Sequence, residues 1–125
     1  MPKKIAIDYG TKRLGIATSD ETNTIAIPKP YIETQNKEKL IKFIKENDIG
    51  EILLGLPKGL GGQETAMTRE VRDFSVWLEQ ETKLPVRLID ERLSTQAAQR
   101  ITKDRELLDS LVAQKLLENY LEQLE

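Results

Sequence analysis

The stretch Lys3–Ser19, KKIAIDYGTKRLGIATS, decides the fold of this chain. Its first part is a short run of alternating apolar residues that ends at Asp8, and Gly10 then interrupts the run. A second apolar run, Leu14–Ser19, follows after a tight turn. Short apolar runs separated by a glycine turn are typical of neighbouring antiparallel strands. We therefore expect a β-hairpin that carries an acidic residue at the end of its first strand.

The next part of the chain adds one strand and then changes to helical periodicity. Pro28 and Pro30 punctuate the sequence before a third short strand, Pro30–Thr34, so the three strands should form an antiparallel meander. A helix is then expected to open after Asn36, which is a plausible N-cap residue, and to close at Gly50.

The second half of the chain alternates strands with helices. Ile52–Leu56 is a continuous apolar run, as in a strand buried on both faces. The glycine-rich loop Gly59–Gly62 leads to a helix, and Val86–Asp90 is another short strand. A short helix after Ser94 and a long one after Asp104 complete the chain. The order β-β-β-α-β-α-β-α-α predicts an α/β fold in which a mixed five-stranded sheet carries helices on both faces.

The composition restricts the chemistry that is open to the chain. Its 125 residues suit a single domain, which we expect to span residues 1–125. The chain has no cysteine and no histidine, which excludes thiolate nucleophiles, Ser-His pairs and the usual zinc sites. A metal ion would have to be held by oxygen, which favours Mg²⁺ or Mn²⁺. The missing cysteines and the lack of a long apolar run predict a cytoplasmic protein with no membrane partner.

Three acidic residues stand out by their positions. Asp8 and Glu91 each lie at the close of a predicted strand, and α/β proteins gather functional groups at the carboxyl ends of their strands. Asp109 falls in the apolar arc of the last helix, where an uncompensated carboxylate is costly. Each also has a structural interpretation: Asp8 could cap the glycine turn, Glu91 could pair with Arg92, and Asp109 could pair with Arg92 or Arg105.

The functional interpretation joins the three acids in one site. Carboxylates that converge at a sheet edge repel one another unless a cation lies between them. With Mg²⁺ or Mn²⁺ they would form a two-metal site, in which one ion activates water and the other stabilises the leaving oxygen. We therefore predict that Asp8, Glu91 and Asp109 are both the catalytic and the metal-binding residues of an enzyme that hydrolyses phosphodiester bonds.

Motifs along the whole chain share residues, order and spacing with a known family. They are Ile7–Ala17 with Ser19 and Asp20, Gly55–Pro57, Val71–Phe74, Leu84–Val86, Asp90–Thr95 and Leu108–Ser110. With these motifs the chain resembles the YqgF/RuvX family of pre-16S ribosomal RNA nucleases, which were once proposed to be Holliday-junction resolvases. The resemblance implies a ribonuclease H-like fold, with Asp8, Glu91 and Asp109 at the family's acidic catalytic positions. It also implies processing of the 5′ end of pre-16S rRNA in ribosome biogenesis, with ribosomal assembly particles as potential partners.

Basic and hydroxyl side chains near the acids are the candidates for substrate binding. They are Lys12, Arg13, Lys58, Arg92, Ser94 and Thr95. Arg100, Lys103 and Arg105 form a second small basic cluster near Asp109. Aromatic residues make up only 5% of the chain, which argues against a base-stacking platform and favours structured RNA recognised through its phosphates. Branched DNA is the alternative substrate. The formal net charge of −2 argues mildly against a broad basic surface.

Two other classes of function stay open at this point. An Asp-x-Gly-Thr turn between antiparallel strands also opens actin-like ATPases and sugar kinases. Those proteins need a second lobe and an adenosine pocket, which a chain of 125 residues cannot hold. The other class is a non-catalytic ribosome- or nucleic-acid-binding module that keeps the fold without the chemistry.

Overall fold

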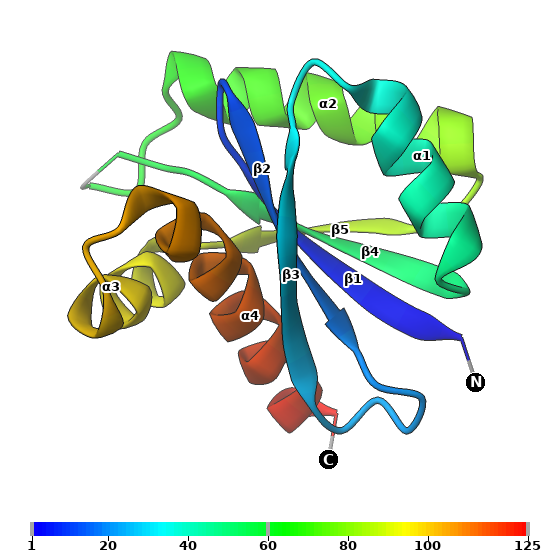
Figure 1. Cartoon of the computed structure of the whole chain (residues 1–125). Coiled ribbons are helices and arrows are strands. Elements are labelled where there is room, and N and C mark those ends of the chain that lie inside the picture. The colour runs from blue at the N-terminus through cyan, green and yellow to red at the C-terminus, as the bar shows by residue number, and fades with distance from the viewer. Residues whose placement is uncertain (1, 60, 125) are drawn as a thin grey trace.

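A computed structural model describes residues 2–59 and 61–124 and contains a five-stranded sheet with helices on both faces (Figure 1). Its elements follow in the predicted order: β1 (Lys3–Tyr9), β2 (Arg13–Ser19), β3 (Ala26–Glu33), α1 (Lys37–Glu46), β4 (Ile49–Leu56), α2 (Ala66–Thr82), β5 (Val86–Asp90), α3 (Arg92–Ile101) and α4 (Arg105–Gln123). The strand order in the sheet is β3-β2-β1-β4-β5. The predicted α/β class and element order are therefore confirmed.

The pairing of the strands brings the ends of three of them to one edge. β1 and β2 are antiparallel, and Asp8 lies opposite Gly15. β4 is parallel to both β1 and β5, and Leu56 lies opposite Asp90. The carboxyl ends of β1, β4 and β5 consequently share one edge, toward the left of Figure 1, where α3 begins. In mixed and parallel sheets this edge is the usual location of a functional site.

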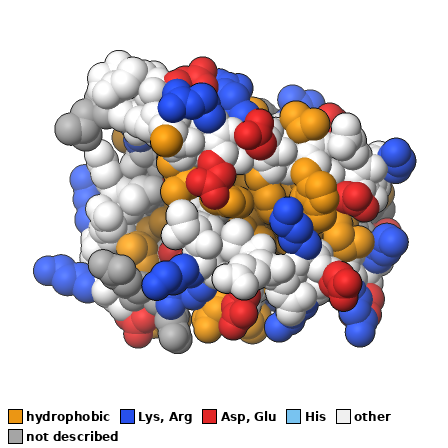
Figure 2. All heavy atoms as spheres, turned by 90° about the horizontal axis from the view of Figure 1, so that it is seen from above, with side chains coloured by type: hydrophobic (Ala, Val, Ile, Leu, Met, Phe, Trp, Pro, Cys, Tyr) orange, Lys and Arg blue, Asp and Glu red, His pale blue; other side chains and the backbone are white. Residues whose placement is uncertain are grey.

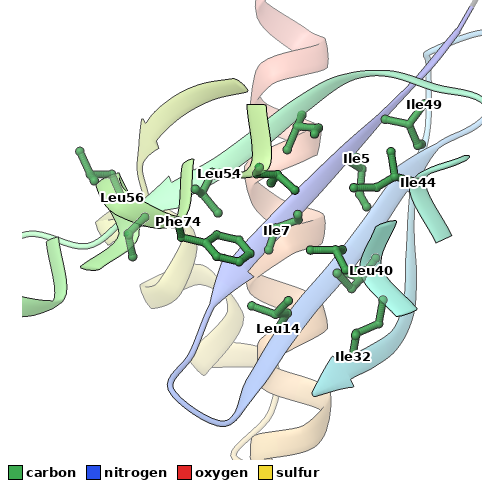
Figure 3. Packing of buried hydrophobic residues seen from close by; sticks show 14 residues of the cluster. Ile5, Ile7, Leu14, Ile32, Leu40, Ile44, Ile49, Leu54, Leu56 and Phe74 are labelled. Carbon is green, nitrogen blue, oxygen red and sulfur yellow. The ribbon is translucent and has the colours of Figure 1, made fainter. Parts of the chain in front are cut away.

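Two hydrophobic cores lie on the two faces of the sheet, because side chains alternate along each strand. One core packs residues such as Ile5, Ile7 and Leu54 against α1 and α2, as Figure 3 shows. The opposite core packs α4 against smaller residues, including Ala6 and Ala17. Small side chains on this face allow α4 to lie close to the sheet. The run Ile52–Leu56 is buried throughout, as expected for a strand covered on both faces.

The third strand and the first helix differ from the predicted boundaries. β3 begins at Ala26 rather than Pro30, so both prolines lie inside the strand. It tolerates them because it is an edge strand, which does not need every backbone N–H for pairing. Asn36 caps α1 as predicted, with its side chain accepting a hydrogen bond from the Lys39 N–H. The helix ends at Glu46 instead of Gly50, because Asp48 takes the left-handed conformation (φ 52°) that was expected of the glycine.

The helix after β5 also begins earlier than predicted. It starts at Arg92, with Glu91 in the N-cap position, rather than after Ser94. The Asp90 carboxylate accepts a hydrogen bond from the Arg92 N–H and so satisfies a donor of the first turn. This places Glu91 at the junction of β5 and α3, which matters for the site below.

The face formed by α1 and α2 carries a groove with an apolar floor and charged residues of both signs around it. Hydrophobic side chains gather in the middle of this face, with lysines, arginines and acids around them (Figure 2). The groove has a volume of about 620 Å³, and Ile41 and Trp77 line it between basic and acidic neighbours. Trp77 lies beneath the Lys37 ammonium, 4.7 Å from ring centroid to Nζ. In the parts of the chain that the structure describes, no helix has the length and apolar character to cross a membrane.

Candidate active site

The alternation of side chains places two of the predicted acids on the α4 face of the sheet. Ala6, Leu53 and Ile89 belong to the core beneath α4. The residues two positions further along β1 and β4 and beyond β5 are Asp8, Gly55 and Glu91, and a period of two carries them to the same face. A Cβ atom at Gly55 would overlap Oε2 of Glu91. The glycine on the intervening strand therefore leaves the space in which the Glu91 carboxyl lies.

Asp8 and Glu91 form a desolvated pair of carboxyl groups. Burial raises the pKa of Asp8 well above its ordinary value of 3.8, and a hydrogen bond with Glu91 and the charges of Glu91 and Asp109 raise it further. Burial also raises the pKa of Glu91, with a contribution from the Asp90 charge, although its hydrogen bond with Asp8 acts in the opposite direction. Oε2 of Glu91 is buried and has no hydrogen-bond partner among the described atoms. The pair is thus held in an environment that disfavours two negative charges.

Asp109 approaches this pair from α4 and is held by an arginine. Its Oδ2 lies 3.2 Å from Nε of Arg13, and the two side chains are 26% and 29% exposed, respectively. The Arg13 guanidinium also lies over the Tyr31 ring, 5.5 Å from its centroid. A Cβ atom at Gly15 would overlap the backbone carbonyl of Asp109, so this glycine permits the close approach of α4 to β2. Because Gly15 is opposite Asp8, the close approach brings the charge of Asp109 near Asp8.

The oxygen donors at this edge suit a hard divalent ion, although the three acids do not yet surround one. Within residues 2–59 and 61–124, no three acidic side chains form a group that could hold a metal ion. Asp8 and Glu91 interact with each other, and Asp109 interacts with Arg13. A cation would restore the ionisation that burial opposes and would give the buried Glu91 oxygen a partner. Asp8 and Glu91 therefore fit a divalent ion, whereas Asp109 contacts Arg13 in this structure.

Two grooves flank the acids and contain most of the predicted substrate-binding residues. The first, of about 780 Å³, includes Lys12 and Arg13 in its wall. The second, of about 690 Å³, includes Lys58, Arg92 and Thr95. The exposed Arg92 is held there by Asp90, with 2.7 Å between Nη2 and Oδ2.

Ser94 is the predicted substrate-binding residue that the structure keeps out of both grooves. It is only 3% exposed and lies beside residues of β5 and α4. Its position on α3 directs it toward the neighbouring helix, whereas Thr95 lines the second groove.

Sequence reasoning missed the partner of Asp109 and part of the first groove. The structural interpretation of Asp109 named Arg92 or Arg105 as its partner, but Asp109 contacts Arg13, and the side chain of Arg105 lies outside the described part of the structure. The antiparallel pairing of β1 and β2, which places Gly15 opposite Asp8, was the available signal. Gln99 and Thr102 line the first groove and carry no motif that would single them out.

The site can now be compared with known proteins. Residues 2–123 match a family model described as RuvX, Holliday junction resolvase. The chain belongs to the RuvX family. A RuvX relative from Maridesulfovibrio salexigens, named "Putative pre-16S rRNA nuclease", is 38% identical and covers 95% of this chain and 97% of its own. Another of the same name, from Koribacter versatilis, is 35% identical over 94% of this chain and 85% of its own. The predicted family and the predicted enzyme class, a nuclease, are both confirmed.

Solved structures with the same fold support the ribonuclease H-like architecture of this RuvX chain. Thermus thermophilus RuvC in complex with a Holliday junction substrate has a TM-score of 0.62 at 13% identity and covers 99% of this chain and 96% of its own. The fowlpox virus resolvase in complex with Holliday junction DNA has a TM-score of 0.59 at 13% identity, with 98% of each chain covered. At these identities the likeness concerns the fold alone, which is the predicted one.

Proposed function

We propose that this RuvX chain is a Mg²⁺- or Mn²⁺-dependent nuclease that cleaves near the 5′ end of pre-16S rRNA, in the cytoplasm and on ribosomal assembly particles. The observation that carries the proposal is the Asp8–Glu91 pair. Two carboxyl groups are desolvated side by side at the carboxyl edge of the sheet, and one buried oxygen lacks a hydrogen-bond partner. Such an arrangement is costly for folding and favourable for binding a cation.

The residues of the chain have distinct roles in this proposal. Asp8 and Glu91 would hold the divalent ions, with Asp109 as the third carboxylate, and Arg13, which contacts Asp109, would be the nearest cation to a substrate phosphate. Divalent ions, when bound, supply an activated water and stabilise the charge on the leaving oxygen. The basic side chains that line the two grooves, Lys12, Arg13, Lys58 and Arg92, would hold the phosphates of the substrate, with Thr95 as the hydroxyl contact. Without histidine, the chain's proton acceptors near the substrate are carboxylates.

A four-way DNA junction is the second candidate substrate, because the matching family model is described as a Holliday junction resolvase. The two substrates differ in what the flanking grooves would hold: a folded RNA strand in one case and a DNA strand at a branch point in the other. Both grooves present basic side chains that can contact phosphates, which carry no sequence information, together with apolar residues such as Leu108 and Leu93. Only a direct comparison of the two substrates separates them.

The test measures cleavage of a precursor rRNA fragment and of a four-way DNA junction, in Mg²⁺, in Mn²⁺ and in EDTA. We expect metal-dependent cleavage of the RNA at discrete positions and slower cleavage of the junction. Glu91→Gln should abolish cleavage and also the rise in melting temperature that the metal produces in the parent. Glu64→Gln is the matched control, since Glu64 is an exposed glutamate paired with Arg72. Faster cleavage of the junction would assign the enzyme to DNA, and binding without cleavage would make it a non-catalytic module.

A further inference from the structure

The first groove beside the acids contains residues that have no role in the proposed chemistry. It is built from two segments far apart in sequence, the turn between β1 and β2 and the connection from α3 to α4. The residues that line it are Gly10, Thr11, Lys12, Arg13, Gln99, Thr102, Lys103, Leu108 and Asp109. Its volume of about 780 Å³ is sufficient for several nucleic-acid backbone atoms with their phosphate oxygens.

This groove opens directly onto the proposed metal-binding acids. Asp109 forms part of its wall, and the backbone of Asp109 lies against Gly15, which is opposite Asp8 in the pairing of β1 with β2. Arg13 lines the same groove and contacts Asp109. A strand that occupies the groove would therefore pass beside Asp109 and lead toward Asp8.

The charges of the two grooves are unequal. Among the described residues that line the first groove, Lys12, Arg13 and Lys103 lie with Asp109, which pairs with Arg13, so the two lysines remain in excess of the acid. The second groove contains two basic side chains and two acids, and its Arg92 is already held by Asp90. Lys12 and Lys103 are both exposed, so they are accessible to a ligand. An anionic ligand would therefore bind more strongly in the first groove than in the second.

The uncharged groups of the first groove suit phosphate as well. Thr102 Oγ1 accepts a hydrogen bond from the Asp104 backbone N–H at 3.1 Å, which fixes the oxygen and leaves its proton able to donate. Gln99 and Thr11 add further donors at the rim. None of the described lining residues is aromatic, so the groove offers no surface on which a base could stack. The described lining thus suits the phosphates of a backbone better than the stacking of a base.

We propose that this groove is the main phosphate-binding subsite of the enzyme and that Thr102 and Lys103, together with Lys12, hold the substrate backbone on one side of the scissile phosphate. The inference rests on the proposed function and deepens it, because it predicts that the two grooves bind the substrate backbone with unequal strength. Most of the salt-dependent affinity comes from the strand segment in the first groove, and the segment in the second groove contributes less.

The experiment measures the binding of a precursor rRNA hairpin and of a four-way DNA junction in EDTA, at several salt concentrations, by fluorescence anisotropy. For Lys103→Gln we expect roughly fivefold weaker binding of the substrate. We also expect the slope of log K against log salt to fall in magnitude by about 0.7–0.9, the value for one lost phosphate contact. Thr102→Val should weaken binding with no change of slope, because it removes a donor and not a charge.

Lys42→Gln is the matched control, since Lys42 is 75% exposed and lies on α1, on the opposite face of the sheet. Equal slopes for Lys103→Gln, Lys42→Gln and the parent would overturn the subsite while leaving the proposed function intact. A parent protein that binds neither nucleic acid would overturn both proposals. If Lys103→Gln affects only one of the two ligands, that ligand is the one that occupies the groove. Circular dichroism and melting temperatures check that each variant is folded.

Discussion

Two clusters that contain acids lie on the α4 face of the sheet, at opposite ends of the strands. One is Glu51 with its basic partners, and the other is the pair Asp8 and Glu91. At the amino end of β4, Glu51 pairs with Lys4 at 2.7 Å, contacts Arg87, and accepts a hydrogen bond from the Tyr120 hydroxyl at 3.3 Å. At the carboxyl end, within residues 2–59 and 61–124, neither Asp8 nor Glu91 forms an ion pair with a lysine or arginine like those of Glu51. The charge of Glu51 is therefore compensated by neighbouring cations, whereas the charges of Asp8 and Glu91 are not.

The ionisation of the two clusters reflects this difference. Burial of Glu51 opposes its ionisation, but hydrogen bonds from Lys4 and Arg87 outweigh it and lower the pKa of Glu51 below its ordinary value of 4.5. Burial raises the pKa of both Asp8 and Glu91. A group stabilised in its charged form contributes to folding, whereas a group destabilised in its charged form is available for a ligand. Glu51 therefore stabilises the folded state at one end of the strands, whereas Asp8 and Glu91 at the other end destabilise it unless a ligand neutralises them.

Substitutions in the two clusters should differ most in their effect on the rate of cleavage. Asp8→Asn should reduce the cleavage rate by more than the roughly 10–100-fold that follows loss of a residue supporting a metal ligand, because Asp8 is a proposed ligand itself. Glu51→Gln should leave the rate within a few-fold of the parent, since Glu51 lies at the opposite end of the strands. Single-turnover cleavage of the precursor rRNA fragment measures both. Equal losses in the two variants would mean that the Asp8 effect is a folding defect.

The second effect concerns stability and should follow the reverse order. Glu51→Gln should lower the free energy of unfolding by about 1–3 kcal/mol, because Lys4 and Tyr120 lose a charged hydrogen-bond partner. Asp8→Asn should be at least as stable as the parent, since it removes a charge that burial disfavours. Urea unfolding at neutral pH, without metal, measures both changes. A clear loss of stability in Asp8→Asn would show that Asp8 has a structural role in the glycine turn.

The smallest effect is a difference in pH dependence. Because the pKa values of Asp8 and Glu91 are raised above 3.8 and 4.5, the folded protein holds more protons than the unfolded chain, and stability falls as pH rises through the folded pKa values. The lowered pKa of Glu51 acts in the opposite sense: its contribution is complete above 4.5 and is lost as pH falls through the folded value.

Unfolding free energies measured between about pH 3 and 8 separate the two contributions. Asp8→Asn should flatten the decrease toward neutral pH, and Glu51→Gln should flatten the decrease toward acid. The parent with saturating Mg²⁺ serves as the control for the first, because a bound cation removes the reason for the raised pKa values. Identical pH profiles for Asp8→Asn and the parent would contradict the desolvated carboxyl pair.

The fold could be predicted from the sequence because local patterns and the global arrangement agree. The alternating run that ends at Asp8, the apolar run Ile52–Leu56 and the cap at Asn36 each specify their own element. The errors occurred where the tertiary position decides. Pro28 and Pro30 are compatible with a strand only because β3 lies at the edge of the sheet, and the sequence does not state which strand has an outer edge.

The candidate site could be predicted only as a set of residues, and its interactions required the structure. The sequence alone determined that a metal ion could be held only by oxygen, that acids lie at the ends of β1 and β5, and that Asp109 belongs to the apolar arc of the last helix, because these properties depend on residue type and periodicity. Only the tertiary structure shows that the absence of a side chain at Gly55 leaves space for Glu91, and that Gly15 permits the close approach of α4. It also shows that Arg13 contacts Asp109. These are close approaches between segments distant along the chain, and only the packing of the helix on the sheet fixes them.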